Sequence, residues 1–324
     1  MYPQVQLGWH SVLHTPRFQR GFKSYWNLAF RTAFYAVLVT TILIGTQVGV
    51  KYSARSLVSY QAQASGSQAI SPKPIPPLPV AVATTPEQPQ IAPVNPSAEL
   101  QAVLDQWGTD HGGHSWSVVV QGLGDDSRSA SLNPDKIRPA ASIYKLFLTY
   151  PLFKRLSVAD LPNIKLPGQG AGQSLAGCVD LMLRVSDNPC GLAVGKYVGW
   201  GQADVLLARA GFGSTKLNTT DGTRTSARDT AELLKSLYEA RLYDSATRDY
   251  LMNILKKQAL NKGIPTGCQG CDVASKTGDF GYVRHDAAII EHGGRAYVLA
   301  IFTSGASYAE IAGLTSKVRA VMAH

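Results

Sequence analysis

The chain has 324 residues, 45% of them hydrophobic and 16% charged, and a net charge of +9, a composition that excludes fibrous and wholly disordered proteins. The charge is uneven, because residues 1–96 carry seven basic residues and one acidic residue (+6), which leaves 24 basic and 21 acidic residues (+3) for the remainder. A nearly balanced remainder without a basic stripe excludes a nucleic-acid surface.

An uncharged apolar stretch covers residues 32–50, close to the ~20 residues that cross a bilayer core. Four basic residues and no acidic residue precede it: Arg17, Arg20, Lys23 and Arg31. The positive-inside rule therefore predicts a cytoplasmic segment over 1–31, a single transmembrane anchor over 32–50, and an extracytoplasmic remainder at the cell membrane. A cleaved signal peptide is the alternative, but the A-x-A-like site at 62–65 lies too far beyond the apolar stretch.

Residues 51–96 form the next segment, and a run within it carries nine of the chain's 18 prolines. Because proline cannot join helices or sheet ladders, the run is predicted to be a semi-rigid extracytoplasmic linker. A binding role for its P-x-x-P pieces is the alternative. The linker would hold the domain at 97–324 away from the membrane.

Residues 97–324 show the alternating patterns of one folded domain. Apolar residues at helical spacing predict helices over 98–112, 141–150, 174–187, 203–212, 226–242, 245–263 and 308–324. Alternating or β-branched runs predict strands over 115–123, 128–132, 272–278, 283–292 and 295–305. This order predicts an α+β fold in which both chain ends build one sheet, with an inserted helical region and a ligand groove between the two.

A serine and a lysine stand three residues apart at the head of the helix predicted over 141–150. On a helix Ser142 and Lys145 share one face, and a buried ammonium there is costly unless it is paired or loses its proton. The alternative is structural: Ser142 caps the helix, and Lys145 extends its amine to water. Motifs elsewhere in the chain are needed to choose between the catalytic and the structural interpretation of Ser142 and Lys145.

Three short motifs occur once each and in this order: S-x-x-K at 142–145, S-D-N at 186–188 and K-T-G at 276–278. Together they make residues 97–324 resemble the penicillin-recognising serine enzymes, the class A β-lactamases and penicillin-binding proteins. The resemblance implies an antiparallel five-stranded sheet flanked by helices. It leaves out the anchor and the linker.

The resemblance also implies roles for the motif residues. Ser142 would be the nucleophile, Lys145 the general base, and Ser186 the relay that carries a proton to the leaving nitrogen. Burial and the nearby Lys276 would favour the neutral amine of Lys145. Asp187 would only fix its loop.

The other motif residues would bind the substrate. Asn188 would bind either Lys145 or the substrate amide carbonyl, and Lys276 and Thr277 would hold a substrate carboxylate. Gly278 would let the strand approach the ligand closely. The oxyanion hole would be the backbone N–H groups of Ser142 and Asp279.

The chain departs from the class A pattern E-x-x-L-N, whose Glu activates the deacylating water. Here Leu217 and Asn218 match, but Ser214 replaces Glu, which predicts a deacylation step slower by roughly 10² to 10⁴. We therefore expect a penicillin-binding protein of the D,D-carboxypeptidase type, reacting with β-lactams and with peptidoglycan stem peptides. The alternatives are a class A-type β-lactamase with a different base, and a non-catalytic β-lactam sensor or scaffold.

Three residues around the last strands are ambiguous. Asp286 stands where class A enzymes usually carry a cation for the substrate carboxylate, and Arg284 is the neighbouring substitute. His285 is interpreted as a hydrogen-bonded strand residue, because serine-lysine chemistry does not need it.

Pro151 should kink or end the helix that begins near Ser142.

All four cysteines follow the anchor, in a compartment where disulfides persist. The favoured pairs are Cys178 with Cys190 and Cys268 with Cys271. Zinc at the C-x-x-C of 268–271 is the alternative, but no second pair or nearby histidine completes a ligand set. We expect no metal and no cofactor.

Overall fold

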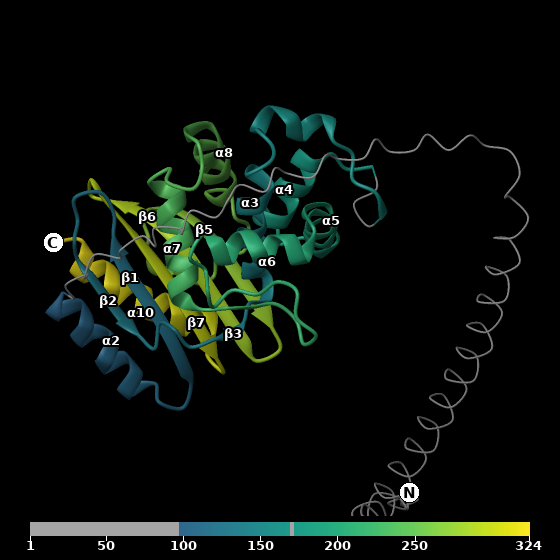
Figure 1. Ribbon diagram of the computed structural model, residues 1–324. Coiled ribbons are helices and arrows are strands. Elements are labelled where there is room, and N and C mark those ends of the chain that lie inside the picture. The colour runs from purple at the N-terminus through teal and green to yellow at the C-terminus, as the bar shows by residue number, and fades with distance from the viewer. Residues whose placement is uncertain (1–96, 169–171) are drawn as a thin grey trace, which may run out of the picture. The chain divides into compact units, whose positions relative to one another are not determined.

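The computed structural model describes residues 97–168 and 172–324, and these form an α+β domain (Figure 1). The predicted segments at 1–31, 32–50 and 51–96 lie outside the described residues. Within the described ranges, no helix combines the length and apolar character needed to cross a membrane. The anchor therefore stays a prediction.

Five antiparallel strands form the central sheet in the order β2-β1-β7-β6-β5. The strands are β1 (Ser115–Gly122), β2 (Ser129–Leu132), β5 (Asp272–Phe280), β6 (Val283–His292) and β7 (Arg295–Ser304). β1 pairs with β7 in the register Val119 to Ala300, so the two ends of the chain meet in the middle of the sheet. The predicted five-stranded fold is confirmed. A separate short ladder joins β3 (Arg138–Pro139) to β4 (Arg224–Thr225).

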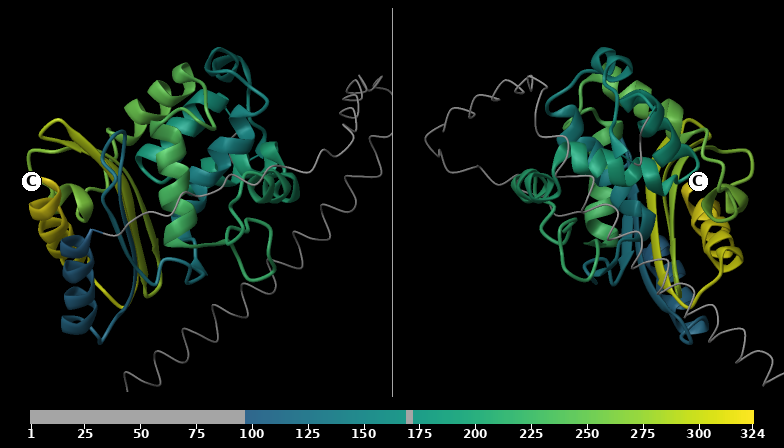
Figure 2. Two further views of the ribbon diagram at one scale, coloured as in Figure 1. Left: turned by 60° about the vertical axis from the view of Figure 1, so that its left-hand side comes forward. Right: turned by 90° about the vertical axis from the view of Figure 1, so that its right-hand side faces the viewer.

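Alternation along the strands separates two hydrophobic cores. On one face Val118, Leu299 and Ile301 pack with α2 (Ala98–Asp110) and α10 (Tyr308–Met322). On the other face the alternate residues Val119, Ala300 and Phe302 belong to a larger core with α7 (Ala227–Tyr238) and the helical region. Figure 2 shows the two helical layers on opposite sides of the sheet.

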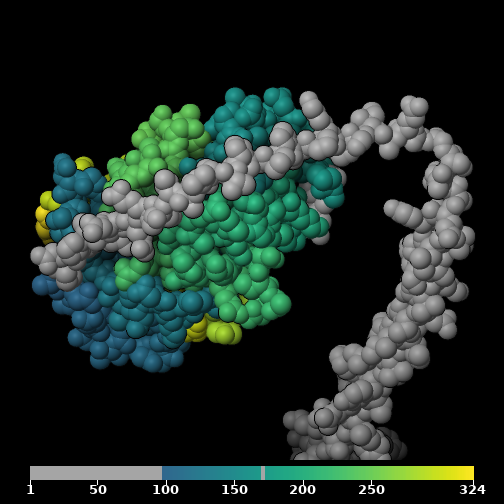
Figure 3. All heavy atoms as spheres, viewed as in Figure 1, coloured from purple at the N-terminus to yellow at the C-terminus, as the bar shows by residue number. Residues whose placement is uncertain are grey.

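The helical region comes from the middle of the chain, as its teal and green surface in Figure 3 shows. Its elements are η1 (Ala141–Ile143), α3 (Tyr144–Phe153), η2 (Val158–Asn163), α4 (Leu175–Arg184), α5 (Asn188–Val198), α6 (Trp200–Arg209) and α8 (Ser245–Leu255). Ser174 caps α4 by accepting a hydrogen bond from the N–H of Gly177. Pro151 lies inside α3, which ends two residues later.

The largest errors among the sequence-based helix predictions are one helix that is too long and one helix that was missed. The helix predicted over 245–263 ends at Leu255, because Ala259 donates its N–H to the Arg184 carbonyl of α4 and leaves the helical path. A separate α9 (Ile264–Gly267) follows. Helix α5 was not predicted, although Asp187 caps it and Pro189 lies in its first turn, both ordinary signals of a helix start.

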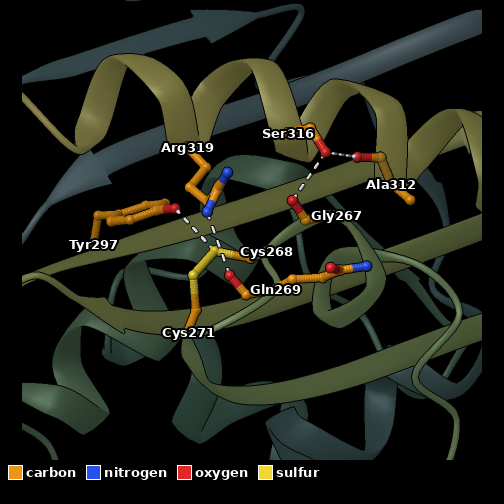
Figure 4. Close-up of a disulfide and its surroundings, with 8 residues drawn as sticks. All are labelled: Gly267, Cys268, Gln269, Cys271, Tyr297, Ala312, Ser316 and Arg319. Carbon is orange, nitrogen blue, oxygen red and sulfur yellow. Dashed lines mark hydrogen bonds between the residues drawn. A yellow bond between two sulfur atoms is a disulfide. The ribbon is translucent and has the colours of Figure 1, made fainter.

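The two disulfides join Cys178 to Cys190 and Cys268 to Cys271, the pairing that the sequence favoured. The first connects α4 to α5. The second closes the turn between α9 and β5, below α10, where Ser316 and Arg319 donate to the Gly267 and Gln269 carbonyls (Figure 4). In the described part of the chain all cysteines are bonded and no His/Cys/Asp/Glu group could hold a metal ion, so the zinc alternative is not supported there.

Candidate active site

Ser142 lies in the 3-10 turn η1, between β3 and α3. The preceding residue, Ala141, has a φ of 46°, a left-handed conformation that costs a non-glycine residue free energy. Ile143 is fully buried on the other side, while Ser142 is partly exposed. The nucleophile candidate therefore stands on a strained turn, open to solvent and anchored by its buried neighbour.

Lys145 is completely buried and makes three hydrogen bonds. Its Nζ lies 3.1 Å from Ser142 Oγ, 2.6 Å from the Ser186 carbonyl oxygen and 2.7 Å from Asn188 Oδ1. Burial lowers its pKa to about 8, with Asp187 opposing the shift. An amine that is 0% exposed does not extend to water, so the alternative of a solvent-reaching lysine is wrong.

Helix α5 makes the room for this lysine. A Cβ at Gly191 would lie 2.7 Å from Lys145 Cε and 2.6 Å from the hydroxyl of Tyr144, closer than real contacts allow. Glycine at this position lets α5 pack directly on the aliphatic stem of Lys145. No local pattern in the sequence identifies Gly191, because its effect depends on a contact with a lysine more than 40 residues away in the chain.

The S-D-N loop approaches from the junction of α4 and α5. Ser186 adopts a φ of 62°, a second strained residue at the site. Asp187 caps α5 by accepting a hydrogen bond from the N–H of Cys190 (2.7 Å), in agreement with a loop-fixing role. The disulfide between Cys178 and Cys190 brackets the loop, so both of its flanks are fixed.

The K-T-G residues lie on β5, the edge strand. Lys276 is fully buried, and its Nζ donates to Ser186 Oγ (2.8 Å) and to the Thr277 carbonyl (2.7 Å). Burial and the charge of Lys145 lower its pKa to about 7. Gly278 packs against the nucleophile turn, since a Cβ there would lie 3.0 Å from Ile143 and 3.2 Å from the Ala140 carbonyl.

One hydrogen-bonded chain therefore joins the three motifs, from Ser142 through Lys145 and Ser186 to Lys276. A neutral amine at Lys145 can accept the proton of the Ser142 hydroxyl. Ser186 contacts Lys145 through its backbone carbonyl and Lys276 through its hydroxyl, so Lys276 is the amine placed to exchange a proton with that hydroxyl. Asp279 directly follows Gly278, beside the nucleophile turn. The oxyanion role of the Ser142 and Asp279 N–H groups stays a prediction.

Carboxylates of the flanking helices α6 and α7 hold the loop at 211–225. Asp229 accepts hydrogen bonds from the Ser214 N–H (3.0 Å) and the Thr215 hydroxyl, and Asp204 accepts from the Leu217 N–H (2.6 Å). In residues 97–168 and 172–324, no carboxylate is hydrogen bonded to Ser142 or Lys145. The loop thus shows no substitute for the missing Glu.

Asp286 lies on the sheet face that packs against α9 and α10, away from Lys276. It is fully buried, its Oδ2 accepts from the Ile264 N–H (2.7 Å), and burial raises its pKa to about 7. Arg284 is partly exposed near Asp279, at 3.8 Å, and donates to the Ala306 carbonyl. A wide hollow of 960 Å³ lies at the other end of the sheet, lined by Asp126 and Gly293 among others, and contains none of the motif residues.

Comparison with known proteins places this geometry in a family. Residues 95–321 match the Beta-lactamase enzyme family, whereas a search of curated proteins gave no match. Among solved structures, PBP-A has a TM-score of 0.63 at 23% identity, with coverage of 71% of this chain and 98% of that chain. A mutant PBP-A, solved as an acyl-enzyme complex with penicillin G, has a TM-score of 0.63 at 22% identity, with coverage of 72% of this chain and 99% of that chain. A class A β-lactamase representative from Bacteroides cellulosilyticus DSM 14838 has a TM-score of 0.62 at 16% identity, with coverage of 70% of this chain and 99% of that chain.

Proposed function

The chain belongs to the beta-lactamase enzyme family and is a serine hydrolase of that superfamily, and we propose that within it the protein is a penicillin-binding protein of the D,D-carboxypeptidase type. Ser142 would form an acyl-enzyme with β-lactams and with the D-Ala-D-Ala ends of peptidoglycan stem peptides. The observation that supports this is a complete acylating chain of Ser142, Lys145, Ser186 and Lys276 beside a loop without a deacylating carboxylate.

Acylation follows from the hydrogen-bonded chain. The neutral Lys145 amine takes the Ser142 proton as Oγ forms a bond to the substrate carbonyl carbon. The C–N bond then breaks, the Ser186 hydroxyl gives its proton to the leaving nitrogen, and protonated Lys276, whose Nζ lies 2.8 Å from Ser186 Oγ, replaces that proton. Lys276, when protonated, and Thr277 would hold the substrate carboxylate.

Deacylation needs a base that activates water. Ser214 is a poor base, and the neighbouring Asp229 carboxylate accepts hydrogen bonds from the Ser214 N–H and the Thr215 hydroxyl, so a deacylating water would lack a free base at this position. A bulky penicilloyl ester should persist for this reason. The acyl-enzyme of PBP-A with penicillin G supports β-lactams as ligands here, as a proposal from similarity of fold.

The first experiment follows the intact mass of the purified full-length protein over time after mixing with benzylpenicillin, with Ser142→Ala as the control. A persistent adduct that the control lacks is the expected result. Penicillin consumed without a lasting adduct would indicate a β-lactamase with another base. Neither adduct nor consumption would leave a non-catalytic protein and overturn the proposal.

We also propose that residues 32–50 anchor the protein in the cell membrane with residues 97–324 outside the cytoplasm. The apolar stretch after a basic segment supports this orientation, and two disulfides suit an oxidising compartment. The test is added protease on intact cells or spheroplasts. Digestion of the domain while a cytoplasmic marker survives supports the orientation, and full protection contradicts it.

A further inference from the structure

A buried histidine contacts the chain just before the nucleophile. His285 of β6 is 0% exposed, and its ring stacks on Phe302 with centroids 4.1 Å apart. Its Nε2 lies 2.9 Å from the Pro139 carbonyl oxygen, and the N–H of Thr303 donates to Nδ1 at 3.2 Å. The acylation chain described above does not use this residue.

These two partners define the state of the ring. Because the Thr303 N–H occupies Nδ1 as a donor, Nδ1 carries no proton and Nε2–H donates to Pro139. Burial lowers the pKa of His285 to about 4, in keeping with a neutral ring at neutral pH. The imidazole therefore ties β6 and β7 to the carbonyl of Pro139.

The hydrogen bond between His285 and Pro139 lies next to a strained part of the backbone. Only Ala140 and the left-handed Ala141 separate Pro139 from Ser142. A left-handed alanine persists only where surrounding contacts hold it. Three groups of contacts do so: the His285 bond, the Ala140 N–H to the Thr223 carbonyl (2.8 Å), and the packing of Gly278 on this turn.

The sheet connects these contacts. His285 is the cross-strand partner of Gly278 on β5, so one pair of residues touches the lead-in to Ser142 from both strands. Next to Pro139, the buried Arg138 donates to the hydroxyls of Ser117, Ser304 and Ser115. The segment before the nucleophile is thus bound to β1, β6 and β7.

We propose that His285 is a positioning residue for acyl transfer, whose bond to Pro139 holds the strained turn and so fixes Ser142 Oγ against Lys145 and the K-T-G strand. This inference rests on the proposed function. A histidine that only fills the core would affect stability but would not need Nε2 to donate to Pro139. The two roles therefore differ in which replacement restores activity.

Two variants separate the roles. In His285→Gln the side-chain amide reaches about as far as Nε2 and can donate to Pro139. In His285→Asn the amide reaches only about as far as Nδ1 and can serve Thr303 alone. His292→Asn, near the end of the same strand, is the control for a histidine replacement that does not touch the turn.

The measurement is the rate constant of acylation by benzylpenicillin at saturation, together with the apparent dissociation constant of the complex before acylation. We expect His285→Asn to lower the rate constant about 10- to 100-fold, the effect of a reacting atom displaced by up to 1 Å, while binding changes less than about twofold. His285→Gln should recover to within about threefold of the unmodified protein. Equal losses in both variants, or full activity in His285→Asn, would overturn the inference.

Amide hydrogen exchange of residues 140–143 provides a readout that needs no substrate. Exchange faster in His285→Asn than in His285→Gln supports a held turn, and equal exchange contradicts it. If the unmodified protein never acylates, the proposed function fails, while this comparison still decides whether His285 holds the turn. The two failures are therefore distinguishable.

Discussion

The three-motif centre and the loop at 211–225 differ in where their polar side chains are directed. At the centre, Lys145 and Lys276 both bond to the strained Ser186, Lys145 at its carbonyl and Lys276 at its hydroxyl. At the loop, Asp204 of α6 and Asp229 of α7 accept hydrogen bonds from the N–H groups of Leu217 and Ser214. The contrast supports our proposal that formation of an acyl-enzyme and its hydrolysis depend on separate parts of the fold, so that one can be retained without the other.

The largest expected effect comes from removing the base at the centre. Lys145→Gln leaves a polar side chain that is one bond shorter and cannot accept the Ser142 proton, so acylation by benzylpenicillin should slow by roughly 10² to 10⁴. Stopped-flow or mass-spectrometric acylation rates measure this. Lys154→Gln, at the exposed end of the same helix, should behave like the unmodified protein. An active Lys145→Gln variant would exclude Lys145 as the base.

Acidification should slow the same step without any mutation. Burial lowers the pKa of both lysines, to about 8 for Lys145 and about 7 for Lys276, and only the neutral Lys145 amine is a base. The acylation rate constant at saturating β-lactam should therefore rise several-fold from pH 6 to about pH 7.5 as Lys145 loses its proton, and fall above that as Lys276 loses its own, with apparent pKa values that belong to the pair. A flat profile over this range would contradict a titrating base.

Adding a carboxylate to the loop should give the protein the deacylating base that the loop lacks. Ser214→Glu places a base at the position of the class A glutamate, so hydrolysis of the penicilloyl adduct should accelerate at least about tenfold. The half-life of the adduct by intact mass is the measurement. Ser214→Gln matches the size without the charge and should leave the half-life unchanged. Equal half-lives in both variants would mean that residue 214 does not reach the ester.

A methyl group should be tolerated in the loop but not at the centre. Gly191→Ala forces a Cβ to within 2.7 Å of Lys145 Cε and should lower the acylation rate about tenfold by displacing the amine. Gly213→Ala meets no atom within 4 Å and should change neither acylation nor thermal stability. If Gly191→Ala acylates normally, the fit of α5 against Lys145 is looser than the geometry shows.

Local patterns in the sequence predicted most of the helices and strands. The apolar, β-branched runs at 283–292 and 295–305 are strands β6 and β7 within one residue. Predictions were less accurate where a contact from a distant segment ends an element. Helix α8 stops at Leu255 because the following residues bond to α4, which local periodicity cannot indicate.

The sequence by itself determined the family resemblance and the candidate residues, because three motifs in a fixed order predict a nucleophile, a base and a carboxylate site. Only the tertiary structure decided the state of those residues. Burial lowers the pKa of Lys145, and Gly191 of α5 packs on its side chain. The left-handed turn before Ser142 contacts His285 and Gly278. Burial and held strain are properties of contacts between distant residues, so no local pattern contains them.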